Sequence, residues 1–377
     1  MWSPQRYKTD GKKAGRSDEL LEKAIVQSEM LLNAEHHLPS ILTLNHLSER
    51  SGISRSTIRG FVNRTDHDAY ESFSVRKRSG GRRFIRVPSP QLMQLQRWVN
   101  EHILAPLPVH PASHAFTKGS SIYKCAAKHC GAQWLVKVDV MDFFESISEI
   151  QVFRVFKNLG YQPLVAFELA RICTIRSVSR SPRTLYKQWK VNKPNLQILD
   201  YNSPLLGYVP QGAPTSPLLS NLIMRDADRK LAEIAKTKGL TYTRYSDDLS
   251  FSTRKKNFTR DMAKQTIYDV YKVLSELGLR PQYRKTTIVP PGSKKIILGL
   301  NVDGSEPRLQ KHYKDRIRQH LYYLEKFGPS IHATERGFDS IWGLKSHLQG
   351  MIDYANMIEP EYARSCFERF NSIEWPV

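Results

Sequence analysis

The sequence has few cysteines, no long apolar run and a shortage of acidic residues. Its four cysteines show no paired C-x-x-C spacing, so we expect free thiols and neither a disulfide framework nor a cysteine-based zinc site. No apolar run reaches the ~18 residues of a membrane span, and the N-terminal residues lack an apolar signal core. No internal repeat recurs at a fixed period. These absences favour a reduced, cytoplasmic protein without a membrane segment.

Charge is the strongest compositional feature that is present. The 377 residues include 57 Lys and Arg against 36 Asp and Glu, which gives a formal net charge of +21. The sequence pI is about 9.8. This excess indicates a polyanionic partner, most simply nucleic acid; the alternative is a merely basic soluble protein. A hydrophobic content of 40% allows a buried core and excludes a disordered chain.

The first part of the chain is predicted to be helical after a basic tail. Residues 1–17 have the composition of a frayed tail, and residues 18–33 have helical apolar spacing with acidic residues in the first turn. Residues 42–64 predict two helices separated by Gly52, the second capped by Ser54. This helix-turn-helix pattern fits a DNA-reading helix, but we favour a helical pair that packs on the next domain.

Residues 72–86 alternate around Gly80-Gly81 and predict a hairpin. Six of the twelve residues from Val75 to Arg86 are Lys or Arg. Such a run is usually a solvated face, but on a two-stranded flap it can also grip phosphates. A helix is predicted at 90–104 after the hairpin.

The rest of the chain alternates between strands and helices. Residues 134–140 predict a strand, which becomes a helix after Asp142, and residues 176–208 have the polar, basic composition of an insertion. A Gly/Pro turn then leads into a long helix, followed by a hairpin and a helix at about 258–278. From about 305 onward the pattern is mostly helical.

Three aspartates stand out against the basic background. Asp247 and Asp248 lie at the predicted hairpin tip in "TRYSDDLSFS", and Asp139 ends a predicted strand. Close together they would raise one another's pKa, a cost that divalent cations remove. Mg²⁺ prefers carboxylate oxygens, and a pair of such ions stabilises the attacking and leaving oxygens of phosphoryl transfer. An isolated Asp-Asp pair is more often an exposed turn.

The segments "VDVMDFF", "VPQGAPTSPLLSNL" and "YSDD", in this order, resemble the reverse transcriptase family over residues 70–300. The resemblance implies an α+β right-hand polymerase. Its fingers and palm would span 71–300 with the insertion 176–208, its helical thumb would span 301–377, and an N-terminal helical extension would span 1–70.

The resemblance also implies a site. Asp139, Asp247 and Asp248 would be the catalytic residues and, with the carbonyl of Val140, would hold two Mg²⁺ ions. Phe144, five residues after Asp139, stands where the family places a steric gate against ribonucleotides; the alternative is a core aromatic. The residues implied to bind the incoming dNTP are Arg78, Arg83, Phe144, Gln211, Gly212 and Lys285.

Within the family, "SHAFTKGSSI", "PQGAPTSPLLSNL", "RYSDDLSFS" and "GMIDYANMIEP" look most like bacterial retron enzymes. These copy a dedicated structured non-coding RNA into a branched RNA–DNA hybrid (msDNA) and act with an effector protein in defence against phage, which allows a higher-order complex. Two retron boxes depart from the pattern, as "CAAKH" at Cys125 to His129 and as "ILG" at Ile297 to Gly299.

Basic and aromatic residues interleave at 310–328, which favours contacts to phosphates and unpaired bases. The alternative is an amphipathic helix with its tyrosines in the core. The predicted nucleic-acid contacts are Lys118, His129, Lys311, Lys314, Arg316, Arg318 and Tyr322. Two other functions stay open: a defence-associated reverse transcriptase without branching, and an inactive nucleic-acid-binding relative. The complete set of three aspartates argues against the second.

Overall fold

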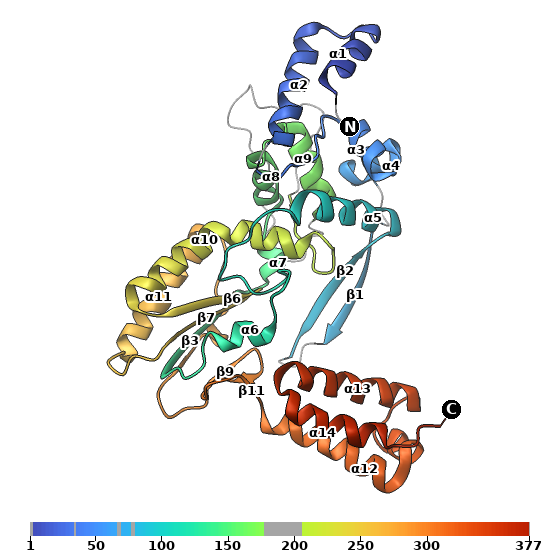
Figure 1. Cartoon of the computed structure of the whole chain (residues 1–377). Helices are drawn as coiled ribbons and strands as arrows, with labels where there is room; N and C mark the ends of the chain where they lie inside the picture. The colour runs from blue at the N-terminus through green and yellow to red at the C-terminus, as the bar shows by residue number, and fades with distance from the viewer. Residues whose placement is uncertain (1–2, 34, 66–68, 77–79, 177–205, 377) are drawn as a thin grey trace. The chain divides into compact units, whose positions relative to one another are not determined.

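The computed structural model describes residues 3–33, 35–65, 69–76, 80–176 and 206–376 (Figure 1). The chain divides into two units, each described by itself. The first unit is Met1–Thr117, Val140–Lys230 and Lys272–Pro281, and the second is Lys118–Asp139, Leu231–Tyr271 and Gln282–Val377. Both contain helices and strands, so the mixed helix and strand content is confirmed. Two predictions concern residues outside the described ranges: nearly all of the insertion 176–208, and Arg78 of the hairpin.

The first unit holds helices and one long hairpin. Its elements are α1 (Pro4–Lys13), α2 (Asp18–Asn33), α3 (Leu44–Ser51), α4 (Arg55–Asn63), β1 (Tyr70–Arg76), β2 (Arg82–Pro88), α5 (Pro90–Val99), the π-helix η1 (Asn100–Leu104), α7 (Phe143–Ser146), α8 (Glu149–Asn158), α9 (Pro163–Ile172), β4 (Ile175–Arg176) and β5 (Gly207–Tyr208). Two further helices, α10 (Ser216–Lys238) and α11 (Arg260–Glu276), supply residues to both units.

The predicted N-terminal tail is wrong, because most of it forms α1. Ser3 caps this helix through a hydrogen bond from the amide of Arg6, and Pro4 stands at the first helical position. Lys8 forms an ion pair with Glu22 of α2, so α1 and α2 are held together by charge as well as by packing. The polar composition of this segment predicts a frayed tail, because the cap and the partner on α2 lie outside the local apolar pattern.

The predicted pair of helices at 42–64 is confirmed as α3 and α4, separated by Gly52 in the left-handed conformation and restarted by the Ser54 cap. The apolar face of α4, which includes Ile58, is buried and packs on α9. Arg171 of α9 donates from Nε to the carbonyl of Val62 at 2.8 Å. The pair therefore belongs to the helical packing of this unit, as the favoured interpretation predicted.

A buried carboxylate joins four segments of the first unit. Glu149 at the start of α8 accepts hydrogen bonds from Arg64, from Thr174 Oγ1 at 3.0 Å and from the amide of Gly207 at 3.0 Å. Arg171 Nη1 lies 3.7 Å from its other oxygen. Two cations and two neutral donors compensate this charge, which is fully excluded from solvent.

The single helix predicted after Asp142 is instead two helices. Ile147 is extended (φ −83°, ψ 115°) and ends α7. Ser148 then begins α8 with a capping box, because its hydroxyl accepts from the amide of Gln151 while the Gln151 side chain accepts from the amide of Ser148. Such a reciprocal cap fixes a helix start within an otherwise continuous apolar pattern.

The predicted hairpin is confirmed as β1 and β2, which pair antiparallel from Tyr70 opposite Pro88 to Arg76 opposite Arg82. In Figure 1 it forms a two-stranded ribbon extending from the start of α5. Alternation along the strands separates two faces. Phe73, Ile85 and Arg83 share one face, and Arg82 lies on the other.

The second unit is built on a four-stranded antiparallel sheet in the order β6-β7-β3-β8. Its strands are β3 (Trp134–Asp139), β6 (Thr241–Tyr245), β7 (Asp248–Thr253), β8 (Thr287–Val289), and the small sheet β9 (Ile296–Ile297), β10 (Leu300–Asn301) and β11 (Arg308–Leu309). Its helices are α6 (Ile122–Ala127), the 3₁₀ turn η3 (Tyr283–Lys285), α12 (Lys311–Glu335), α13 (Ile341–Ile358) and α14 (Pro360–Asn371).

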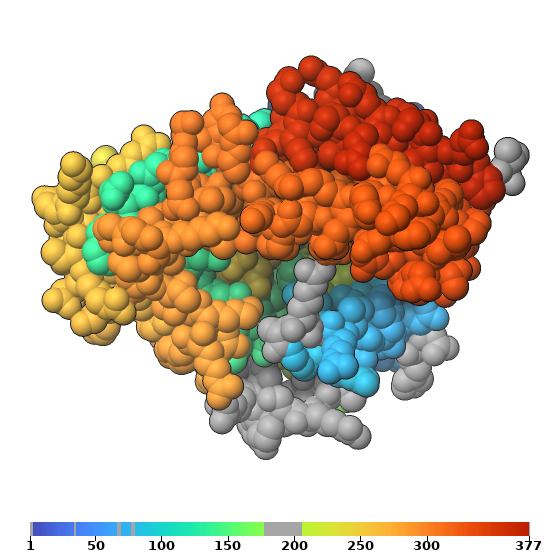
Figure 2. Space-filling view, turned by 90° about the horizontal axis from the view of Figure 1, so that it is seen from below, coloured from blue at the N-terminus to red at the C-terminus, as the bar shows by residue number. Residues whose placement is uncertain are grey.

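Helices α12–α14 confirm the predicted helical C-terminal region. In Figure 2 their orange and red atoms form one continuous surface. Buried residues such as Leu321, Leu348 and Phe370 share one hydrophobic cluster with residues of β9–β11 and α6. Gly328 has non-helical dihedrals next to Pro329, so α12 is kinked there.

The four cysteines are free, as predicted, and all four are buried. Across the described part of the chain, no helix combines the length and apolar character needed to cross a membrane.

Candidate active site

The sheet of the second unit brings two of the three predicted aspartates directly opposite each other. Strands β3 and β7 pair antiparallel so that Asp139 stands opposite Asp248, and Tyr245 at the end of β6 stands opposite Asp248 on its other side. Opposite residues in a ladder point to the same face. Asp139, Lys137 and Asp248 therefore share one face of the sheet, and the apolar residues that alternate with them, such as Val138, face the other way.

The turn between β6 and β7 carries the third aspartate. Ser246 and Asp247 form a two-residue connection, and Ser246 has a positive φ of 59°, as the first central position of a type II′ turn requires. The fully buried guanidinium of Arg244 donates from Nη1 to the carbonyl of Ser246 at 3.1 Å. This bond holds the turn in place, so a buried cation helps to set the positions of Asp247 and Asp248.

Burial and neighbouring charge act together on Asp248. Burial raises the pKa of this carboxyl, and Asp247 and Asp139 raise it further, while Lys137 and Lys285 oppose them; the result is a pKa of about 6. A carboxylate with so high a pKa is poorly compensated in the protein alone. An additional positive charge at this point would stabilise its ionised form.

Lys285 supplies a positive charge to the neighbouring Asp139. Its ammonium lies 2.8 Å from Asp139 Oδ2, and this hydrogen bond raises the pKa of Lys285. The backbone reinforces the arrangement, because the amide of Gln282 donates to the Asp139 carbonyl at 2.7 Å. Lys285 was predicted to lie near the triphosphate, and the structure places it beside a predicted metal ligand.

The donor set suits a divalent cation. Within residues 3–33, 35–65, 69–76, 80–176 and 206–376, no three His, Cys, Asp or Glu side chains are already closed around a metal position. The carboxylates of Asp139, Asp247 and Asp248 nevertheless supply only hard oxygen donors, which Mg²⁺ prefers. Lys285 partly neutralises Asp139, as a bound cation would. The raised pKa of Asp248 shows that the negative charge of the cluster is not fully compensated. The residues therefore fit magnesium in donor chemistry.

Two predicted residues follow Asp139 in the first unit. Val140 is buried and forms an isolated bridge with Pro281. Phe144 in α7 is half-buried, with its ring centroid 5.5 Å from that of Phe143 and 6.3 Å from that of Phe116. Phe143 is the buried member of the pair. The core position in this segment is thus filled by Phe143, which leaves part of the Phe144 ring accessible.

Gln211 and Gly212, both predicted to bind the nucleotide, lie against β2 in the first unit. The carbonyl of Gln211 accepts from the amide of Arg86 in β2 at 2.7 Å. Gly212 has a φ of 118°, and a Cβ there would lie 2.8 Å from the Arg86 carbonyl oxygen and 3.0 Å from Ile85 Cγ2. Only glycine permits this approach. Arg83 is exposed on the hairpin face that it shares with Ile85.

His129, predicted to contact nucleic acid, is buried in the second unit. Its ring is 1% exposed, and its nitrogens lie 2.7 Å from Ser252 Oγ and 2.7 Å from Thr243 Oγ1. The ring ties the segment after α6 to β6 and β7, and it also lines a cavity of the second unit. Its contact with nucleic acid stays a prediction. Lys118, which precedes α6, is exposed and accessible.

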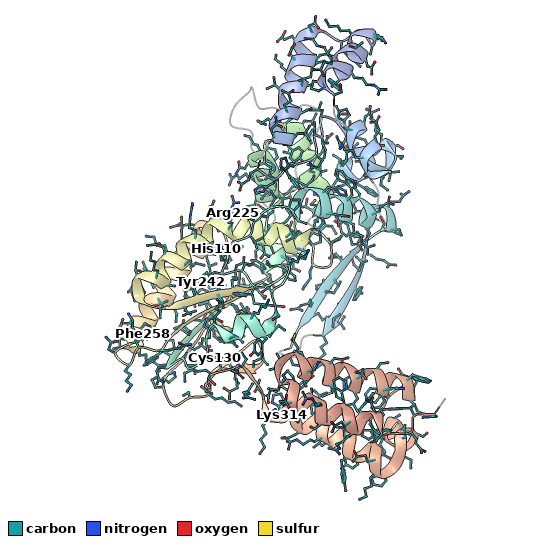
Figure 3. The ribbon with its side chains drawn as sticks, in the orientation of Figure 1. His110, Cys130, Arg225, Tyr242, Phe258 and Lys314 are labelled. Carbon is teal, nitrogen blue, oxygen red and sulfur yellow. The ribbon has the colours of Figure 1, made fainter. Side chains whose placement is uncertain are left out.

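The predicted contacts on α12 fall into two groups. Lys311, Arg316, Arg318 and Tyr322 are exposed. Lys314, labelled in Figure 3, is half-buried, forms an ion pair with Glu359 and lies 4.9 Å from the centroid of the Tyr362 ring. The Lys314 ammonium therefore holds α12 to the start of α14 and has a structural partner.

Two residues were missed from the sequence. Arg244 reads as the polar partner in an alternating strand, yet it is fully buried under the turn. Lys137 lowers the pKa of Asp248 from the neighbouring strand. The signal for Lys137 was present, because it alternates with Val136 and Val138 and shares a face with Asp139.

Comparison with known proteins identifies the class. Residues 75–302 match the family described as reverse transcriptase (RNA-dependent DNA polymerase), so the chain belongs to that family. The retron Mx162 reverse transcriptase of Myxococcus xanthus is 30% identical over 346 residues, which is 87% of this chain and 66% of that protein. The retron Mx65 enzyme of the same species is 30% identical over 89% of this chain and 73% of its own length.

A third relative, the retron Ec86 reverse transcriptase of Escherichia coli, is 29% identical over 87% of this chain and 93% of its own length. The chain is a retron-type reverse transcriptase, and the predicted enzyme class is confirmed.

Two solved structures align with this chain at low similarity. A telomerase from Candida albicans covers 81% of this chain and 56% of its own, with 11% identity and a TM-score of 0.42. A foamy viral protease–reverse transcriptase covers 81% and 44%, with 14% identity and a TM-score of 0.36. Values this low carry no conclusion about function.

Proposed function

We propose that this protein copies a dedicated structured non-coding RNA into a branched RNA–DNA hybrid, as a retron reverse transcriptase acting in defence against phage. The observation that supports synthesis most directly is the placement of Asp139 opposite Asp248, with Asp247 on the adjoining turn. Membership of the retron group supports the choice of template and product. The net charge of +21 suits a protein that holds RNA and DNA.

In this proposal the chain has the parts of a right-hand polymerase. The hairpin β1–β2 belongs to the fingers, the sheet with Asp139 and Asp248 is the palm, and α12–α14 form the thumb. The proposed boundaries are 1–70 for the N-terminal extension, 71–300 for fingers and palm, and 301–377 for the thumb.

Each site residue has a distinct task. Asp139, Asp247 and Asp248, with the Val140 carbonyl, would hold two Mg²⁺ ions, which would supply charge stabilisation to the attacking hydroxyl and the leaving pyrophosphate. Arg244 keeps the aspartate turn in place, and Lys285 compensates Asp139 and would lie near the nucleotide phosphates. Arg83 and Arg78 bind the triphosphate, and Gln211 and Gly212 line the nucleotide pocket. Phe144 excludes a 2′-hydroxyl.

The partners follow from the reaction. They are the cognate RNA, its cDNA, the four dNTPs and an effector protein, in a cytoplasmic complex. Lys118, Lys311, Arg316, Arg318 and Tyr322 contact the RNA, because their cations and ring are exposed. Lys314 contributes to this RNA-binding surface indirectly, because its ion pair with Glu359 holds α12 to the start of α14.

Incorporation of labelled dNTPs on a primed RNA template with Mg²⁺ tests the polymerase. We expect extension that EDTA abolishes; a folded protein that binds RNA without extending the primer would favour an inactive binder. Sequencing the nucleic acid that copurifies with the protein tests the retron product. A branched RNA–DNA species supports the proposal, and linear cDNA alone would favour a defence-associated reverse transcriptase without branching.

A further inference from the structure

A basic cavity lies at the opposite end of the sheet from the aspartates. Its volume is about 470 Å³, within the roughly 300–1,000 Å³ of small-ligand pockets. Three segments of the second unit line it: the residues after α6, the connection between α10 and β6, and the end of β7. Asp248 and Thr253 are the two ends of β7, so about 17 Å of strand separates the cavity from the catalytic end.

The lining has cations and no acid. Lys128, Arg254 and Lys255 contribute positive charge, and neither Asp nor Glu is among the lining residues. All three cations are exposed, and none forms an ion pair with a carboxylate of the described ranges. The nearby Glu306 lies 3.8 Å from Arg308 instead. Three convergent cations repel one another unless an anion joins them.

Arg254 is held in a fixed orientation. Its Nε donates to the carbonyl of Cys130 at 3.0 Å, and a Cβ on Gly131 would lie 3.7 Å from the same nitrogen. Cys130, which follows α6, is labelled in Figure 3. With Nε used, the terminal guanidinium nitrogens have no hydrogen-bond partner among the residues that the structure describes. A guanidinium anchored at one edge presents a planar pair of donors that matches phosphate.

Lys255 enters from the other side. A Cβ on Gly239 would overlap the Lys255 ammonium nitrogen, so the glycine leaves the space that this group occupies. Thr253 Oγ1 donates to the Gly239 carbonyl at 3.1 Å and accepts from the Lys255 amide at 3.1 Å. The simpler role of Lys255 is to compensate the C-terminus of α10. That role explains neither Lys128 nor the open donors of Arg254.

We infer that this cavity binds a phosphate group of an RNA segment remote from the catalytic aspartates. The inference rests on the proposed function for its RNA, and it adds a second point of attachment at the far end of the palm strands. Arg254 supplies oriented donors, and Lys128 and Lys255 supply mobile charge. A ligand held here keeps RNA on the protein without entering the catalytic end of the sheet.

The test compares two double variants of equal charge. Lys128→Gln with Lys255→Gln removes two cavity cations and leaves the Arg254 bond to Cys130 intact. Lys256→Gln with Lys294→Gln removes two exposed charges outside the lining. Binding of a labelled 20-nucleotide uridine oligonucleotide is measured from 50 to 200 mM salt, with folding checked by melting temperature. Uridine 5′-monophosphate is titrated separately, and extension of a primed RNA template is measured for each protein.

We expect the cavity variant to bind the oligonucleotide about five- to tenfold more weakly and to lose about 0.7 of a unit of the log–log salt slope for each phosphate contact removed. The control variant should change less than twofold. Equal effects in both variants, or none, would overturn the inference. So would a cavity variant that loses only binding of the monophosphate, which would assign the cavity to a free nucleotide. Primer extension reports on the proposed polymerase independently, because neither variant touches the aspartates.

Discussion

Two hairpins of this chain carry opposite charges and are packed in opposite ways. On β1–β2, Phe73 is 52% and Phe84 is 50% exposed, and Arg82 and Arg83 are exposed beside them. On β6–β7, residues of both faces are buried. Even the polar Thr243 and Ser252 are buried there, and both bond to His129.

The difference shows where charge has a structural cost. An exposed arginine remains hydrated, so β1–β2 can carry a positive charge with little effect on stability. A buried carboxylate is stabilised only by neighbours, and Asp248 consequently has a raised pKa. The exposed arginines of the β1–β2 flap can bind an anionic ligand from solvent. The carboxylates at the β6–β7 turn are undercompensated, so a bound cation would stabilise them.

Neutralising Asp248 should have the largest effect and should separate function from stability. We expect Asp248→Asn to lower primer extension by at least about 10²–10³-fold, because one charged contact to the reacting centre is lost. In EDTA at pH 7.5 the variant should unfold less easily. A pKa raised from 3.8 to about 6 means that the folded state penalises the ionised form, by up to about 3 kcal/mol.

This penalty is complete above pH 6 and disappears as pH falls toward 4. Asp226→Asn is the control, since Asp226 is an exposed partner of Arg229. Extension at near the wild-type rate in Asp248→Asn would contradict the assigned site.

Arg83→Ala and Arg82→Ala sharpen the comparison within the flap itself. The two arginines are neighbours, but only Arg83 shares the face of Ile85 that meets Gly212. We expect Arg83→Ala to raise the KM for dNTPs about ten- to hundredfold, as loss of a hydrogen bond to a charged group does. Arg82→Ala should change it less than threefold. Equal effects would mean that the flap acts through its total charge.

Phe144→Ala should relax sugar selection by about tenfold. Removing the half-buried ring opens space beside the incoming sugar, and Phe144→Tyr, which keeps a ring, should preserve selection. Competition between dNTP and rNTP in single-nucleotide extension measures the ratio. If Phe144→Ala rejects ribonucleotides as wild type does, or melts like a variant of the buried Phe143, the ring belongs to the core.

The prediction with the smallest expected effect concerns His320. Burial disfavours the positive charge of this residue, just as it disfavours the negative charge of Asp248. His320 Nδ1 lies 2.9 Å from His332 Nε2 inside α12–α14, with His347, Arg336 and Arg316 also acting on it. Burial and these neighbours lower the pKa of His320 to about 4. Below pH 6.5 the unfolded state takes up a proton that the folded state refuses, so stability falls as pH drops toward 4.

Hydrogen exchange in α12 and α13 should show opening easier by about 1–2 kcal/mol at pH 5 than at pH 7.5. His320→Gln should remove most of this dependence. His312→Gln, an exposed histidine of the same helix, should leave it unchanged. The same pH dependence in all three proteins would place its origin in another group.

Local patterns predicted the elements well because their causes are local. The hairpin at 72–86, the helical pair at 42–64 and the three aspartates were all visible as periodicity, caps or motifs. The missed features depend on partners distant in sequence. His129 is enclosed by residues more than one hundred positions away, and Lys314 is paired with Glu359. No local pattern specifies whether a polar residue is solvated or buried with such a partner.

The register of β3 against β7 makes strand length part of the site. Insertion of one residue within Trp134–Asp139 would keep every carboxylate in the chain, yet it would turn Asp139 to the apolar face and remove it from Asp248. A deletion inside β7 would do the same from the other side. Evolution can therefore lengthen the segment between β4 and β5 far more freely than it can alter either strand, and length differences among related enzymes should accumulate outside this ladder.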